Sequence, residues 1–125
     1  MAYEEQHQYA VYLFEQGFFE NAARLMAEVI REEATGERWN DWASAQADCG
    51  RYAEAEHGYQ RAIELGDPGG RATANLAVVL VRTQQYAPAI PLLKQAIKQA
   101  TEQDVELLAK LLTLCHHRQT KPCQS

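Results

Sequence analysis

Four potential metal ligands gather near the end of the chain, at Cys115, His116, His117 and Cys123. Structural zinc sites usually hold paired ligands about two to four residues apart, on knuckles or on one helix face. Adjacent histidines on a helix point in divergent directions, and Cys123 falls in a polar terminal segment. The pattern therefore favours a solvated helix end, with imidazoles near the negative end of the helix dipole, over a zinc site. We expect no metal and no cofactor.

A second chemical possibility is a cysteine nucleophile at Cys49, with His57 on the following helix as its base. Such catalysis needs an oriented base and an oxyanion site, and no motif surrounds either residue. Cys49 also precedes Gly50 at a helix end, an environment that does not favour a thiolate. The glycine-rich segment 66–70 lacks the spacing and the lysine of a phosphate-binding loop. The sequence thus predicts no catalytic residue and a protein that is not an enzyme.

Charge and composition narrow the remaining classes of function. The formal net charge is −5 and no run of lysine or arginine exceeds two residues, which argues against a nucleic-acid partner. No stretch has the about eighteen apolar residues of a membrane span, and the acidic start MAYEEQHQY is unlike a secretory signal. Three cysteines form a sparse, odd set that fits reduced thiols. We expect a cytoplasmic protein with no membrane partner.

Self-similarity at a fixed period is the feature that would position any functional side chain. Five landmarks of the segment 36–68 are Gly50, Tyr52, Ala55, Ala62 and Ile63. They return 34 positions later as Gln84, Tyr86, Ala89, Ala96 and Ile97, and have counterparts 33 positions earlier at Gly17, Phe19, Ala22, Val29 and Ile30. A period of this size predicts stacked helical hairpins, each covering the apolar face of its neighbour.

Helical periodicity and stop signals divide the chain into seven expected helices. The first covers residues 3–16 and the second 19–31; the next pair meets at Cys49-Gly50 and ends at the segment 66–70. The third pair begins near Arg71 and turns at residues 83–85, with Pro88 and Pro91 expected in the opening turn of its second helix. Residues 101–104 predict a capping box before the last helix. We expect an all-α chain with a single domain over 1–117, a capping helix at 102–117 and a flexible tail at 118–125.

These residues resemble the tetratricopeptide repeat family, whose unit is a helix–turn–helix of 34 residues. In the second unit the family positions are occupied by Trp39, Ala43, Gly50, Tyr52, Ala55, Tyr59 and Ala62. The third unit has Thr73 and Gln84 where a bulky residue and a glycine belong, and the first has Gln6 and Val29 at unusual places. The resemblance implies a right-handed superhelix of three repeats, at about 3–35, 36–69 and 70–103. Core packing explains Trp39 and Trp42 better than ligand stacking.

The resemblance also implies a concave groove, lined by the first helix of each hairpin, that binds a peptide or protein segment. The positions that would face it are Glu4, His7, Val11, Phe14, Asn40, Asp41, Ser44, Asp48, Arg71, Asn75, Val78 and Arg82. The alternative interpretation of the polar residues in this set is ordinary solvated helix surface. A subgroup of the family grips a terminal carboxylate at the positions of His7, Val11, Asp41, Arg71 and Asn75. Only Arg71 fits that clamp, and Asp41 would repel a carboxylate, so the sequence argues against it.

The sequence therefore predicts an interaction scaffold that holds a protein or peptide. Alternatives are a chaperone like the class II type III secretion chaperones, or the N-terminal module of a larger glycosyltransferase or methyltransferase. Self-association is a further possibility, through a last helix that contains Leu107, Leu108, Leu111, Leu112 and Leu114.

Overall fold

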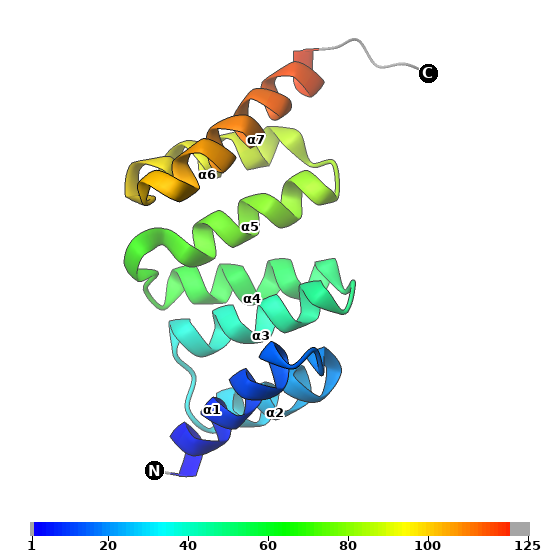
Figure 1. The fold of residues 1–125 in the computed structure, drawn as a ribbon, viewed down its shortest axis with the longest axis vertical. Helices are drawn as coiled ribbons and strands as arrows, with labels where there is room; N and C mark the ends of the chain where they lie inside the picture. Colours follow the sequence, from blue (N-terminus) through cyan, green and yellow to red (C-terminus); the bar gives the residue numbers. More distant parts are fainter. Residues whose placement is uncertain (1, 121–125) are drawn as a thin grey trace. The chain divides into compact units, whose positions relative to one another are not determined.

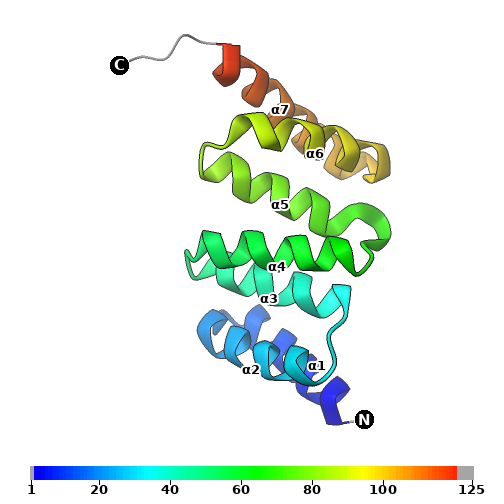
Figure 2. The same cartoon turned by 180° about the vertical axis from the view of Figure 1, so that it is seen from behind.

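The computed structural model describes residues 2–120, and these residues form α-helices joined by short turns, with no strand among them. The α-helices are α1 (Ala2–Glu15), α2 (Phe19–Glu32), α3 (Gly36–Asp48), α4 (Tyr52–Glu64), α5 (Arg71–Arg82), α6 (Tyr86–Gln99) and α7 (Glu102–Thr120). A short 3-10 turn, η1 (Pro68–Gly70), precedes α5. The predicted all-α class with seven helices is thus confirmed for the described part of the chain (Figures 1 and 2).

The chain divides into two compact units, Met1–Asp67 and Pro68–Ser125, and each is described here by itself. The first unit holds two hairpins, α1–α2 and α3–α4, and the second holds the hairpin α5–α6 followed by α7. The predicted division between the second and third repeats falls at the same place, in the glycine-rich segment 66–70. That one domain extends over residues 1–117 stays a prediction.

The turns inside the three hairpins share one pattern of backbone hydrogen bonds. The amides of Phe18, Arg51 and Gln85 donate to the carbonyls of Leu13, Gln46 and Leu80 at 2.9, 2.9 and 2.7 Å. The preceding residues adopt positive φ angles, 91° at Gly17, 81° at Gly50 and 62° at Gln84. This is the Schellman ending of a helix, which requires a left-handed residue after the last turn. Gln84 takes the same conformation with a side chain, where glycine has no steric penalty.

The first unit packs around a cluster of small buried residues. The cluster contains Ala10 from α1, Ala22, Ala23 and Met26 from α2, and Ala45 from α3. Trp42 packs against it, as do Val11, Leu13, Phe14 and Leu25. Alanines allow the helices to approach closely, so that a few large side chains can fill the spaces between them. The predicted packing role of Trp42 is confirmed, and Trp39 meets it edge-to-face at 5.5 Å.

The helix α3 begins at a side-chain cap that fixes the entry into the second hairpin. Thr35 has an extended backbone, and its Oγ1 accepts a hydrogen bond from the amide of Arg38 at 3.1 Å. Threonine at this position satisfies one of the amides that have no acceptor within the helix. The sequence break predicted at residues 34–36 is therefore the start of a capped helix.

In the second unit, α6 lies between α5 and α7, and both of its prolines differ in their setting. Pro88 is in the first turn of α6, as predicted, but Pro91 lies inside the helix. A residue other than proline at 91 could donate its amide to the carbonyl of Ala87, so this hydrogen bond is lost. The prediction that both prolines mark the helix start is wrong for Pro91. The core of the unit includes Ala77, Leu80, Ala89, Leu93, Ala96, Leu108 and Cys115.

The last helix is longer than the sequence indicated. Thr101 and Asp104 do meet before it, through a hydrogen bond of 3.2 Å from the threonine hydroxyl to the carboxylate. The helix α7 then continues to Thr120, so residues 118–120, expected in a flexible tail, are helical. The remainder of the predicted tail, 121–125, lies outside the described residues. Within the described part of the chain, no helix combines the length and the apolar character that crossing a bilayer demands.

Replacement of Gln84 by glycine is expected to stabilise the protein by about 0.5–1 kcal/mol. The substitution removes the Cβ strain of a left-handed residue, which outweighs the added freedom of glycine in the unfolded chain. The measurement is urea unfolding followed by circular dichroism. The matched control is Gly50→Ala, which places a Cβ in open space but in the same strained conformation and should lower stability by a similar amount. Equal stability of Gln84→Gly and wild type would contradict this account of the third turn.

Candidate functional site

The predicted groove residues are divided between the two units, and in the first unit most of them contact other helices. His7 from α1 and Asp41 from α3 are joined by a hydrogen bond of 2.9 Å between Nε2 and Oδ2. Ser44 of α3 and Tyr59 of α4 share a hydroxyl–hydroxyl hydrogen bond of 2.8 Å. Asn40 is buried and has interactions of its own. These polar side chains therefore hold α1, α3 and α4 together.

Burial decides which members of the set can reach a partner. His7 is only 4% exposed and Asn40 only 5%, so we assign both to packing between helices and leave them out of the proposed contact surface. Val11 and Phe14 are half-buried against the alanine cluster. Asp48, at the end of α3, is exposed. In the first unit, the binding role of Val11, Phe14, Asp41, Ser44 and Asp48 stays a prediction.

The imidazole of His7 has one further property that bears on its chemistry. Its Nδ1 atom is buried and has no hydrogen-bond partner among the described residues. A lone pair at Nδ1 costs less in such a place than an N–H group, which favours the tautomer that carries its proton on Nε2 and donates it to Asp41. The ligand atoms of His7, Glu37 and Asp41 lie within 4.8 Å of one another. Metal binding through Nε2 would move the proton to Nδ1, so we assign His7 to the hydrogen bond with Asp41.

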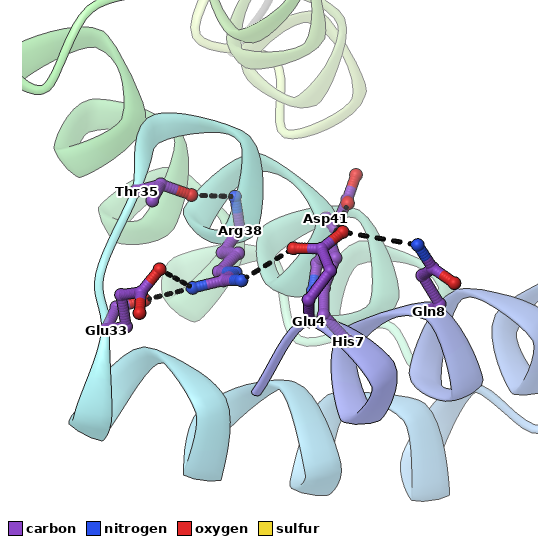
Figure 3. A network of polar contacts seen from close by, with 7 residues as sticks. All are labelled: Glu4, His7, Gln8, Glu33, Thr35, Arg38 and Asp41. Carbon is purple, nitrogen blue, oxygen red and sulfur yellow. Dashed lines mark hydrogen bonds and ion pairs between the residues drawn. The ribbon is translucent and has the colours of Figure 1, made fainter. Parts of the chain in front are cut away.

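A buried arginine, Arg38, is the centre of the polar network that the sequence did not reveal (Figure 3). Its guanidinium is 5% exposed, and it donates to the carbonyl and to Oε1 of Glu33 at 2.9 and 3.0 Å. A third hydrogen bond of 2.9 Å reaches Oε2 of Glu4 on α1. Arginine presents several donors in a fixed plane, so one side chain satisfies both partners while the charge is buried. The pairs Glu4–Arg38 and His7–Asp41 both have a separation of 34 residues.

The second unit contains a cavity of about 310 Å³ that opens between α5 and α7. Three of the four groove residues predicted in this unit line it, and the fourth, Arg82, does not. The complete lining is Gly69, Gly70, Arg71, Ala74, Asn75, Val78, Ala96, Ala100, Asp104, Leu107 and Leu108. Its walls are aliphatic, with a guanidinium and a carboxylate among the lining groups. Such a cavity suits an apolar side chain of a partner, flanked by polar contacts.

Sequence reasoning missed the contribution of α7 to this cavity. Leu107 and Leu108 were noted as part of a leucine-rich surface, but as a route to self-association. Leu108 is buried, and Leu107 is 57% exposed. The available signal was the helical spacing of Asp104, Leu107 and Leu108, which places them on adjoining sides of the same helix.

The cysteines and histidines considered for chemistry are held in structural positions. Cys115 is buried, and this burial raises the pKa of its thiol, which disfavours the thiolate needed by a nucleophile or a zinc ligand. Its neighbours His116 and His117 are exposed, and Cys123 lies outside the described residues. His57 packs edge-to-face on Trp39, with ring centroids 5.7 Å apart.

Comparisons with solved structures identify the fold. The TPR2B domain–pHsp70 complex of yeast Sti1 matches with a TM-score of 0.82 and 22% identity, covering 93% of this chain and 97% of that one. The Yersinia enterocolitica type III secretion chaperone SycD, in complex with a peptide of the translocator YopD, matches with a TM-score of 0.86 and 15% identity, covering 93% of each chain. The TPR domain of Sgt2 from Aspergillus fumigatus matches with a TM-score of 0.77 and 13% identity, over 99% and 87%.

The chain therefore has the tetratricopeptide repeat fold, with three helical hairpins followed by a capping helix. No protein-family model matches the sequence. A search of curated proteins finds no significant match either.

Replacement of Arg38 by alanine is expected to lower the free energy of unfolding by about 2 kcal/mol. Three hydrogen bonds are lost, one of them to a backbone carbonyl, while the carboxylates of Glu4 and Glu33 are more than half exposed and stay hydrated. Chemical denaturation monitored by tryptophan fluorescence measures the change. The matched control is Arg31→Ala, an exposed arginine of α2, which should change stability by less than about 0.5 kcal/mol. Equal effects of the two substitutions would contradict a structural role for Arg38.

Proposed function

We propose that this protein is a non-catalytic module that binds a peptide or protein segment, and that the cavity between α5 and α7 is its anchor site. The observation that carries the proposal is the lining of this cavity, in which Arg71, Asn75 and Val78 of α5 face a site completed by α7. The likeness to the Sti1 and SycD structures, both complexes by their descriptions, supports the same class of function.

The chemistry of the cavity describes the bound segment. An aliphatic or aromatic side chain would fill the space beside Val78, Leu107 and Leu108 and bury apolar surface. Arg71 has no ion-pair partner among the described residues, so its guanidinium is available to a carbonyl or carboxylate of the segment. Apolar anchoring with a few polar contacts is the usual division between affinity and register in peptide recognition.

The proposal predicts that changes in the cavity weaken binding, whereas a similar change elsewhere on the same helix does not. The probe is a synthetic array of extended peptides, followed by fluorescence anisotropy with those that bind. Val78→Ala and Arg71→Ala should each raise the Kd about five- to tenfold, since each removes about 1 kcal/mol of contact. Arg82→Ala is the matched control, because Arg82 has the same charge and helix as Arg71 but does not line the cavity.

The control also separates two versions of the binding site. A groove lined by the whole inner face of α5 would lose affinity on Arg82→Ala as well, whereas a site centred on the cavity would not. Absence of binding to any peptide by the wild-type protein would contradict the proposed function. Binding that none of the three substitutions weakens would contradict the proposed location.

One observation favours a more specific candidate, a chaperone for an exported protein. The likeness to SycD with its YopD peptide extends over 93% of both chains. Co-expression with an exported protein from the same genome tests this candidate, since a chaperone would co-purify with it and raise its solubility. The role of N-terminal module in a larger enzyme, the cytoplasmic location and the absence of a nucleic-acid partner stay predictions.

A further inference from the structure

The outer face of α1 exposes aromatic side chains that no described residue covers. Tyr9 is 57% exposed and Tyr12 54%, and their rings stack with centroids 6.2 Å apart. Phe18, directly after the turn of this hairpin, is 55% exposed. Exposed apolar groups that gather in one place mark interaction surfaces more often than scattered ones do. We define the α1 face as Glu5, Tyr9, Tyr12 and Phe18.

The repeat register shows what such a face does elsewhere in the chain. Thirty-three positions after Tyr9, Tyr12 and Phe18 stand Trp42, Ala45 and Arg51. Trp42 and Ala45 are packed into the cluster formed by the first hairpin. Arg51 donates to the carboxylate of Glu20 on α2 at 2.7 Å. The positions that α3 uses to pack on α2 are therefore the positions that α1 leaves exposed.

The surface of α2 that receives α3 has a counterpart on α7. Around Trp42, α2 contributes Glu20, Ala23, Arg24 and Ala27. Each of these residues has a similar residue 86 positions later, and the four counterparts on α7 are Glu106, Ala109, Lys110 and Thr113. All four are exposed, and we define them as the α7 face. The buried residues follow the same register, with Val29 in α2 and Cys115 in α7 both fully covered.

Charge distinguishes between the ways in which two copies could meet. The first unit, residues 1–67, carries fourteen acidic residues and five arginines, whereas residues 68–125 carry three acidic and seven basic residues. Two α1 faces brought together would oppose acidic helices, which contain Glu4, Glu5 and Glu15. Contact between the first unit of one copy and the second unit of another brings opposite charges together.

We propose that the α7 face of one copy packs on the α1 face of a second copy, repeating between molecules the contact that α2 makes with α3. The small side chains of Ala109 and Thr113 receive Tyr9 and Tyr12, as Ala23 and Ala27 receive Trp42 in the chain itself. The contact joins two different surfaces, so it does not close on itself. Copies therefore associate head to tail, and the assembly lengthens as the concentration rises.

Two variants that each block one end test this arrangement by sedimentation velocity. The double variant Tyr9→Ser/Tyr12→Ser removes the α1 face, and Ala109→Glu/Lys110→Glu makes the α7 face bulky and acidic. All four positions are exposed, so both variants should keep the helical content and thermal midpoint of wild type. Wild type should exceed the 14.1 kDa of one chain increasingly from micromolar to millimolar concentration, and higher salt should weaken this association.

The decisive sample is the equimolar mixture of the two variants. Each variant alone should stay at the mass of one chain, and the mixture should reach twice that mass and no more, because only one productive pair of faces remains. The control Leu65→Ser removes an exposed leucine outside both faces and should associate like wild type. A monomeric wild type over the whole range, association of either variant alone, or a mixture that stays monomeric would overturn the proposal.

Discussion

The close approach of α3 and α4 is the constraint on which the first unit depends. Gly58 is buried in α4, and a Cβ atom there would lie 2.7 Å from Cε3 of Trp42 and 2.8 Å from the Cβ of Ala43. Because Trp42 also packs against the cluster of the first hairpin, the spacing within the second hairpin fixes the surface that meets α2. Small residues at the crossing and one large side chain beside it thus determine both contacts.

The repeating features of the sequence predicted the repeating features of the fold. Gly17 and Gly50 indicated the helix ends correctly, because a Schellman turn needs a left-handed residue and glycine adopts it at the least cost. The third turn was placed correctly at Gln84 from the register alone, although its residue type does not suggest that conformation. Pro91 was misplaced because helix boundaries inferred from composition are uncertain by a few residues, enough to exchange a first turn for a helix interior.

The polar contacts were harder to predict because their partners are distant in the sequence. Nothing in the residue type of Arg38 distinguishes a buried arginine from an exposed one, and its carboxylate partners Glu4 and Glu33 resemble many others in an acidic chain. Histidine and asparagine at His7 and Asn40 suit a binding groove and a helix interface equally well, and burial decides between them. The cavity of the second unit was half predicted, since α5 was recognised as its wall but α7 was not.

Substitution of Gly58 by alanine, with unfolding by guanidinium chloride, tests the central claim most directly. Helix propensity alone favours alanine over glycine by about 1 kcal/mol in a helix interior. If close approach at Trp42 and Ala43 sets the packing, the added methyl group must displace the indole or the helix, and the protein should lose about 1–3 kcal/mol of stability. A gain in stability, as propensity alone would give, would contradict the account.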